Sequence, residues 1–281
     1  MQNDYTITPD QSELGKKAEY DPHYNPDKLF PIPRKLNREK INVPTKLPFY
    51  GFDIWNHYEV SWLNQKGKPV VGLAEIIYNC ESPNIIESKS MKLYFNSFNN
   101  TQIKNADVLQ SIVTKDLSAR VGAEVIVKII PVADFKQEHV FQGFQGECID
   151  ELDIDCSVYT IDPTFLHTEE TSADEILYTD LMKSNCLVTN QPDWGSVQIA
   201  YRGKKINRAG LLRYIVSFRN CNEFSEQCIE RIYMDIMKYC QPENLAVYGR
   251  FTRRGGLDIN PYRSSQKAHP QDLRFSRLCR Q

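Results

Sequence analysis

Alternating apolar and polar positions near the start of the chain predict a β-hairpin. Tyr58 and Trp62 alternate with polar residues within a strand expected over 53–63. A second apolar segment over 69–80 follows the glycine-containing stretch 64–68. Two strand patterns separated by a short turn of this kind favour antiparallel pairing, so these segments are expected to form a hairpin.

The hydrophobic spacing then changes to that of helices. One helix is expected to begin at Ser88 within the segment 88–99. A second is predicted over 106–121, because Asn105 can cap its start and Gly122 follows its end. The β-branched run 124–130 predicts a further strand.

The second half of the chain repeats this order. Strand-like segments occur around Cys186 and over 196–201, and a helix is predicted over 209–218. The next helix, 223–240, is amphipathic, since apolar residues recur in steps of three and four. These residues are Phe224, Cys228, Ile229, Ile232, Tyr233, Ile236, Met237 and Cys240. Strands over 245–252 and 257–263 are expected around the turn 253–256.

This order predicts a duplicated α+β unit, with antiparallel sheets and helices on one face. The proline-rich leader is expected to be extended, and the acidic region 134–180 is interpreted as a connector with one or two short strands. The expected organisation is an extended leader over 1–50, a first module over 51–150, an acidic connector over 151–180 and a second module over 181–281.

Composition places the 281 residues among ordinary globular proteins, with 41% hydrophobic and 25% charged residues. The longest apolar runs are far shorter than the roughly 20 residues that cross a bilayer. The polar N-terminus has no targeting pattern, so a cytoplasmic location without membrane contact is expected. A net charge of -2 provides no general attraction to nucleic acid.

The eight cysteines argue against both a disulfide framework and a metal site. They are spread through the chain without a C-x2-C pair or nearby histidines, so no metal is expected. The chain also lacks the glycine motifs of Rossmann and P-loop nucleotide sites.

Cys186 and Asp193 form the first candidate for chemistry. The residues between them are polar or proline, which predicts a turn that could bring thiol and carboxylate close. A thiolate is a nucleophile, and a carboxyl group kept protonated by burial is a proton donor. On spacing alone the catalytic signal is weak, because most cysteines in a globular chain are small buried hydrophobic residues.

Three other polar clusters each have two interpretations. Glu87, Ser88 and Lys89 at a helix start could hold a phosphate, or form an ordinary capped helix with exposed lysines. The acids in 222–226 could bind a ligand, although the dipole favours them at any helix start. The arginines and glycines in 252–256 could approach an anion, or form a basic hairpin turn.

Several motifs, taken together and in order, closely resemble the long, two-module form of the NADPH-dependent 7-cyano-7-deazaguanine reductases, the QueF family. They are Glu87-Ser88-Lys89-Ser90 with Leu93-Tyr94 and Asn96-Ser97-Phe98-Asn99, then Ser184-Asn185-Cys186 with Gln191-Pro192-Asp193-Trp194-Gly195, and finally Tyr248 with Thr252-Arg253-Arg254-Gly255-Gly256-Leu257-Asp258-Ile259-Asn260-Pro261. The similarity extends from about Gly15 to Gln281 and is weakest in the acidic connector.

The resemblance implies a tunnelling fold (T-fold) of two ββααββ modules, a homodimer, and an enzyme of queuosine synthesis, the pathway of a tRNA modification. The implied reaction reduces a nitrile to a primary amine with two NADPH, by way of a covalent thioimide. By the same resemblance, Cys186 matches the nucleophile and Asp193 the proton donor. Ile86, Glu87, Ser88, Ser225 and Glu226 match substrate-binding positions, and Ser88, Lys89, Arg254 and Gly255 match NADPH-binding positions.

One position departs from the family pattern. Ser225 stands where the family usually has a histidine between Phe224 and Glu226, and a hydroxyl does not titrate near neutral pH. Either water or Asp193 replaces the histidine, or turnover is slower, or the protein only binds a purine or pterin. A cysteine-dependent hydrolase acting on a nitrile or amidine is a further alternative, because the same nucleophile would serve it.

Overall fold

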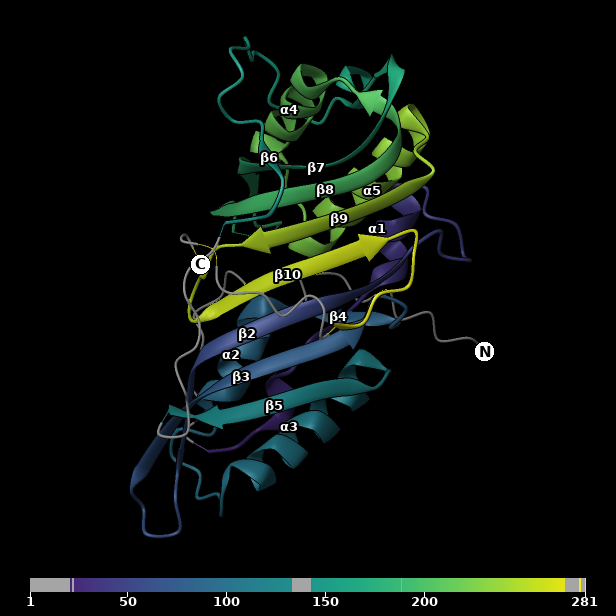
Figure 1. Cartoon of the computed structure of the whole chain (residues 1–281). Helices are drawn as coiled ribbons and strands as arrows, with labels where there is room; N and C mark the ends of the chain where they lie inside the picture. The colour runs from purple at the N-terminus through teal and green to yellow at the C-terminus, as the bar shows by residue number, and fades with distance from the viewer. Residues whose placement is uncertain (1–20, 22, 133–142, 188, 271–277, 279–280) are drawn as a thin grey trace. The chain divides into compact units, whose positions relative to one another are not determined.

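The computed structural model describes residues 21, 23–132, 143–187, 189–270, 278 and 281 (Figure 1). The chain divides into two compact units, and each is described by itself. Unit 1 comprises Met1–Asn37, Trp55–Gln137 and Arg254–Leu257, and unit 2 comprises Arg38–Ile54, Glu138–Arg253 and Asp258–Gln281. The four residues Arg254–Leu257 therefore belong with the N-terminal part of the chain although they lie far along the sequence.

Unit 1 contains the predicted hairpin and helices. The strands β2 (Tyr50–Leu63), β3 (Pro69–Asn79) and β5 (Val125–Pro131) lie in the order β5-β3-β2. The helix α3 (Ala106–Val121) packs on β5, and its predicted caps are confirmed: Asn105 accepts from the Val108 amide, and Gly122 is left-handed. The helix α2 (Ser88–Asn96) begins at the predicted residue.

In its described residues, 21 and 23–50, the leader is less extended than predicted, and the rest of the predicted leader lies outside the described residues. A three-residue strand, β1 (Pro31–Pro33), pairs with β4 (Asn84–Ile86), but α1 (Arg34–Lys40) is helical. No proline occurs between Pro33 and Pro44, so the proline content of the leader did not reveal this helix. The remaining short elements are the 3-10 helices η2 (Pro26–Lys28), η4 (Pro163–Phe165) and η5 (Phe218–Asn220).

Unit 2 is built on a larger sheet. Its strands are β6 (Glu147–Cys148), β7 (Thr168–Asn185), β8 (Pro192–Ile206), β9 (Asn244–Phe251) and β10 (Leu257–Ser264), in the order β10-β9-β8-β7-β6. The helix α4 (Arg208–Ser217) packs on β7, whereas α5 (Ser225–Cys240) packs on β8 and β9 (Figure 1). None of the helices among the described residues is long and apolar enough to cross a membrane.

Two sequence-based expectations for this unit were wrong. β7 begins at Thr168, well inside the region interpreted as a connector with short strands. Most side chains in the first half of β7 are exposed or half-buried, so this half lacks the apolar alternation that reveals a strand. The pair formed by β6 and β7 is parallel, so the sheet is mixed and not wholly antiparallel.

A local arrangement of tyrosine, serine and phenylalanine stabilises the helix pair of unit 1. The Tyr94 hydroxyl on α2 donates to Asp116 Oδ2 on α3 at 2.7 Å. The Ser97 hydroxyl donates to the Tyr94 carbonyl at 2.6 Å, and the rings of Tyr94 and Phe98 meet edge to face at 5.2 Å. The Tyr94–Asp116 hydrogen bond thus joins α2 to α3, and the other two contacts hold the end of α2 around Tyr94.

Unit 2 repeats this arrangement between α4 and α5. Tyr214 donates to Asp235 Oδ2 at 2.7 Å, and Ser217 donates to the Tyr214 carbonyl at 2.6 Å. The rings of Tyr214 and Phe218 are 5.3 Å apart and nearly perpendicular. The matched contacts support the duplication inferred from element order, which rested on pattern alone.

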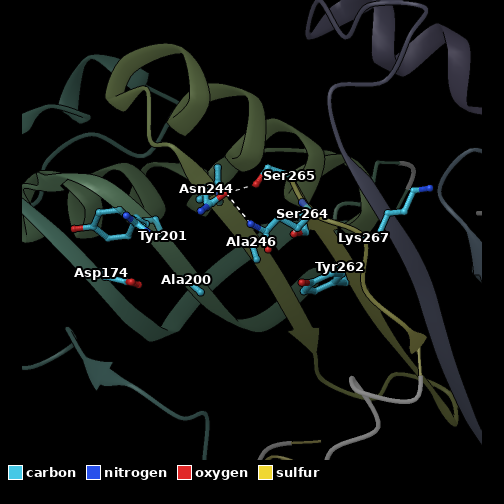
Figure 2. A pocket seen from close by; sticks show the side chains of 12 residues that line it. Asp174, Ala200, Tyr201, Asn244, Ala246, Tyr262, Ser264, Ser265 and Lys267 are labelled. Carbon is cyan, nitrogen blue, oxygen red and sulfur yellow. Dashed lines mark hydrogen bonds between the residues drawn. The ribbon is translucent and has the colours of Figure 1, made fainter.

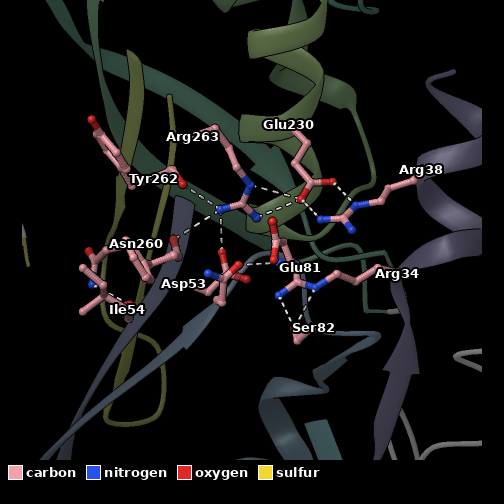
Figure 3. Close-up of polar contacts among 12 residues, drawn as sticks. Arg34, Arg38, Asp53, Ile54, Glu81, Ser82, Glu230, Asn260, Tyr262 and Arg263 are labelled. Carbon is pink, nitrogen blue, oxygen red and sulfur yellow. Dashed lines mark hydrogen bonds and ion pairs between the residues drawn. The ribbon is translucent and has the colours of Figure 1, made fainter. Parts of the chain in front are cut away.

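A buried ion network links four residues of unit 2 that come from four different elements (Figure 3). Arg263 of β10 is 0% exposed and contacts Asp53 Oδ1 of β2 and Glu230 Oε1 of α5, each at 2.9 Å. Arg38 of α1 binds the same Glu230 carboxylate through two nitrogens, at 2.7 and 3.0 Å. The Phe49 ring lies within 5.8 Å of both guanidinium carbons. Because a lone buried charge is very unfavourable, each group requires the others.

Replacing Arg263 with methionine should strongly destabilise the protein, because Asp53 and Glu230 would remain buried without this cation. We expect a loss of about 3–5 kcal/mol in the free energy of unfolding, measured by chemical denaturation. Arg202→Met is the matched control, since the Arg202–Glu243 pair is exposed and should cost below about 1 kcal/mol. Equal stability of the two variants would contradict the prediction.

Candidate active site

The β7–β8 hairpin places Cys186 and Asp193 on one face of the sheet. Ser184 pairs directly with Asp193, and the Cys186 amide donates to the Gln191 carbonyl at 2.8 Å. Opposed residues share a face, as do residues two apart on a strand. Cys186 therefore lies diagonally across from Asp193, as the spacing predicted. Asn190 closes the turn in the left-handed region, at a φ of 54°.

The segment that enters α5 runs alongside this hairpin. The Asn185 amide donates to the Cys221 carbonyl at 2.7 Å, and the Asn185 side chain donates to that of Asn222 at 3.1 Å. Ser225 and Glu226 then occupy the first turn of α5, and both are buried. Unit 2 thus gathers all four of its predicted site residues around the end of β7.

Three thiols, those of Cys186, Cys221 and Cys228, lie near this point. Cys186 is 4% exposed and lies at the strand end. A hydrogen bond with Cys221, together with complete burial, raises the pKa of Cys228 well above its ordinary value. Cys228 is therefore held as a thiol and is poorly suited to nucleophilic attack.

A lysine lies on the other face of the same hairpin. Lys183 donates to Asn185 Oδ1 and to the Arg219 carbonyl, both at 2.6 Å. Burial and the charge of Arg219 lower the pKa of Lys183, and the charge of Asp193 opposes this shift. The charge of Asp193 thus favours the protonated form of Lys183, and Lys183 in turn holds the Asn185 side chain by a hydrogen bond.

In unit 1, Glu87 is the N-cap of α2. Its two carboxylate oxygens accept from the amides of Lys89 and Ser90, at 2.7 and 2.8 Å. Glu87 is 1% exposed, and burial raises its pKa although these amides and nearby lysines oppose the shift. The capped-helix interpretation is thus confirmed for Glu87. Each oxygen retains a second lone pair, so a substrate role stays a prediction.

The turn that follows Arg254 is built from two glycines in the left-handed region. Gly255 and Gly256 have φ values of 59° and 75°, and the Arg254 amide donates to the Leu257 carbonyl at 3.0 Å. A side chain on Gly255 would meet Lys92 atoms at 3.0–3.3 Å. Only glycine suits this close approach in a left-handed turn. The turn therefore lies against Lys92 of α2 in unit 1.

Lys92 is a cation that the residue assignments missed. It follows Lys89 by three residues on α2, which places both side chains on one side of the helix. The three-residue spacing of Lys89 and Lys92 was the sequence feature that could have identified Lys92 as a further cation of this site. Lys89 and Lys92 of α2 and Arg254 of the turn are three cations of unit 1 that suit the phosphates of a dinucleotide, and the Glu59 carboxylate lies against Gly256 in the same turn.

A groove of about 330 Å³ opens on unit 2 (Figure 2), and none of the predicted site residues lines it. It is bounded by β8, β9, β10 and the residues after them, including Tyr201, Ala246, Tyr262 and Lys267. The candidate chemistry therefore lies at the end of β7 and not in this groove.

Family models and curated proteins match this chain over most of its length. The model "Nitrile reductase, 7-cyano-7-deazaguanine-reductase N-term" matches residues 20–129, and the model "QueF-like protein" matches residues 192–270. A protein of Legionella pneumophila (strain Lens), named NADPH-dependent 7-cyano-7-deazaguanine reductase, is 60% identical over 93% of this chain and 92% of its own length.

Two further relatives carry the same name. The protein of Ralstonia nicotianae is 50% identical, and that of a Polaromonas species is 52% identical. Each alignment covers 96% of this chain and 99% of the relative. The chain therefore belongs to the 7-cyano-7-deazaguanine reductase (QueF) family.

Proposed function

We propose that this protein uses NADPH to reduce the nitrile of 7-cyano-7-deazaguanine to a primary amine, through a covalent thioimide on Cys186. The observation that carries the proposal is the hairpin register, which sets Cys186 and Asp193 on one face beside the start of α5. The names of the relatives support the substrate and the cofactor.

Cys186 provides the nucleophile and Asp193 the proton. The Cys186 thiolate adds to the nitrile carbon and forms a C–S bond, while one C–N π bond breaks. Asp193 donates a proton to the nitrogen, which yields a neutral thioimide. Addition of the thiol thus converts a poor hydride acceptor into a C=N bond that is readily reduced.

Two NADPH molecules, bound in turn, would each supply one hydride, and with two protons these complete the change from nitrile to amine. The C–S bond breaks on the way, and Cys186 leaves as the thiolate. In unit 1, Ser88, Lys89, Arg254 and Gly255 are the proposed cofactor residues, and Lys92 adds a third cation. The lysines and the arginine bind phosphate, while the glycines let the backbone approach it closely.

The proposed substrate residues suit a deazaguanine edge, whose ring N–H and amino groups donate hydrogen bonds. Glu87 and Glu226 can accept these hydrogen bonds. Ser88 and Ser225 can either donate or accept a hydrogen bond, and Ile86 contributes apolar surface. Glu226 is buried in the first turn of α5, where the dipole favours its charge.

We also propose the tunnelling fold of two tandem ββααββ modules, within the predicted ranges 51–150 and 181–281, with β7 beginning inside the segment predicted as a connector. The matched contacts of Tyr94 and Tyr214 support it. A cytoplasmic homodimer acting on the free base, without direct nucleic-acid contact, completes the proposal. Light scattering of the purified protein tests the oligomeric state.

Incubation with 7-cyano-7-deazaguanine should add the mass of one substrate molecule to the protein. Cys186→Ala should abolish both this adduct and NADPH oxidation, because the C–S bond can no longer form. Intact-mass spectrometry and the absorbance of NADPH measure the two effects. Cys148→Ala is the matched control, since Cys148 is an exposed cysteine away from the hairpin end.

Three other outcomes distinguish the alternatives. An adduct without NADPH oxidation would indicate binding with impaired reduction. Release of ammonia without NADPH would indicate a hydrolase. If saturating substrate gives neither adduct nor oxidation, the proposed function is wrong.

Ser225→His restores a group that titrates near pH 6.5 beside Glu226. If proton transfer limits the present protein, turnover should rise by about tenfold to hundredfold. Because the protonated imidazole would be the donor, the added activity should fall as pH rises through about 6.5. A turnover and pH profile that match the unmodified protein would show that Asp193 or water suffices.

Arg254→Ala should weaken NADPH binding by about tenfold to hundredfold, because a charge-assisted hydrogen bond contributes about 1.5–3 kcal/mol. Adduct formation with 7-cyano-7-deazaguanine should be retained. Calorimetric titration with NADPH measures the first effect, and Arg202→Ala is the control. Unchanged NADPH affinity in Arg254→Ala would show that the turn is not part of the cofactor site.

A further inference from the structure

His57 of β2 lies in the interior of unit 1 beneath the Arg254–Gly256 turn. The residue is 1% exposed, and its ring meets that of Phe95 edge to face at 4.5 Å. Nδ1 lies 3.0 Å from the Gly256 carbonyl oxygen. A carbonyl oxygen only accepts hydrogen bonds, so Nδ1 carries the proton and donates it to Gly256.

The imidazole is neutral, and its second nitrogen, Nε2, is buried without a hydrogen-bond partner among the described residues. Burial, with a smaller contribution from Lys92, lowers the pKa of His57 to about 4. With Nδ1 protonated, Nε2 presents only a lone pair, and within the described residues that nitrogen has no hydrogen-bond partner. A buried acceptor left unpaired is unfavourable, so an apolar side chain would be easier to accommodate here.

The hydrogen bond from His57 to the glycine turn offsets the cost of leaving Nε2 unpaired. The Gly256 carbonyl accepts from the Tyr58 amide at 2.9 Å as well as from His57. Glycine peptides have the widest conformational freedom in a chain, and this turn carries two of them in sequence. Two donors on a single carbonyl restrict the peptide that follows Gly256, and with it the approach of the turn to Lys92.

We propose that His57 is a positioning residue that preorganises the Arg254–Gly255–Gly256 turn for NADPH. The inference rests on the proposed cofactor role of that turn. His57 contacts the turn and not the reacting atoms, so its loss affects cofactor affinity and leaves the chemistry of Cys186 unchanged. Preorganisation acts by removing the ordering cost of binding.

Three substitutions of His57 separate positioning from simple packing. Asparagine places its amide N–H near the position of Nδ1, glutamine places it nearer that of Nε2, and leucine has no donor. His57→Leu should raise the NADPH dissociation constant by about threefold to tenfold, as the loss of one neutral hydrogen bond implies. His57→Gln should raise the NADPH dissociation constant to a similar extent. His57→Asn should keep that constant within about twofold of the value for the unmodified protein.

Calorimetric titration with NADPH, KM and kcat, and the melting temperature are measured for each full-length variant. We expect the KM for NADPH of His57→Leu to rise, its kcat to stay within about twofold, and its melting temperature to be unchanged or higher. Thioimide formation, measured by intact mass without NADPH, should proceed as in the unmodified protein.

Two results would overturn the proposal, and they are distinguishable from failure of the cofactor site. NADPH affinity that is unchanged in His57→Leu while Arg254→Ala weakens binding would remove His57 from this role alone. Equal weakening in all three His57 variants would reduce its role to packing. Unchanged affinity in Arg254→Ala would overturn the cofactor turn itself, and the role of His57 with it.

Discussion

The buried guanidinium of Arg263 is the interaction on which unit 2 depends. It lies between the carboxylates of Asp53 and Glu230, and Arg38 completes the charge balance. Ions removed from water are tolerated only when partners surround them. The first residues of β2, the strand β10, the end of α1 and the middle of α5 therefore hold a single arrangement, because any shift would leave a charge unpaired.

This constraint extends to the candidate active site along α5. Glu230 lies one turn after Glu226, so anchoring the middle of the helix also sets the position of its first turn. The Asn185 amide bonds the Cys221 carbonyl just before α5, which joins that helix start to the end of β7. The positions of the candidate residues Cys186 and Glu226 thus depend on strand register and helix anchoring, which hold side chains more closely than a loop would.

The two units share a scaffold and differ in chemistry. The tyrosine, serine and phenylalanine contacts of Tyr94 and Tyr214 are nearly superposable in distance and angle. In unit 1 the start of α2 carries a buried carboxylate and two lysines beside a glycine turn. In unit 2 the corresponding helix start, that of α4, is capped by Asn207, and the candidate residues lie instead at the end of β7 (Cys186) and in the first turn of α5 (Glu226). The helix pairs of the two units therefore share these contacts, while the candidate site residues lie at different positions relative to them.

The sequence by itself determined the features that depend on neighbouring residues. The first hairpin, the caps of α3 and the amphipathic α5 follow from local periodicity, and the short turn between Cys186 and Asp193 follows from its composition. Only the tertiary structure decided where β7 begins, that β6 pairs in parallel, and that the Arg254 turn lies against Lys92 and His57. The ion network of Arg263 also has no local signal. Each of these depends on contacts between segments far apart in the chain, and a one-dimensional pattern does not record which distant charge or carbonyl a side chain will meet.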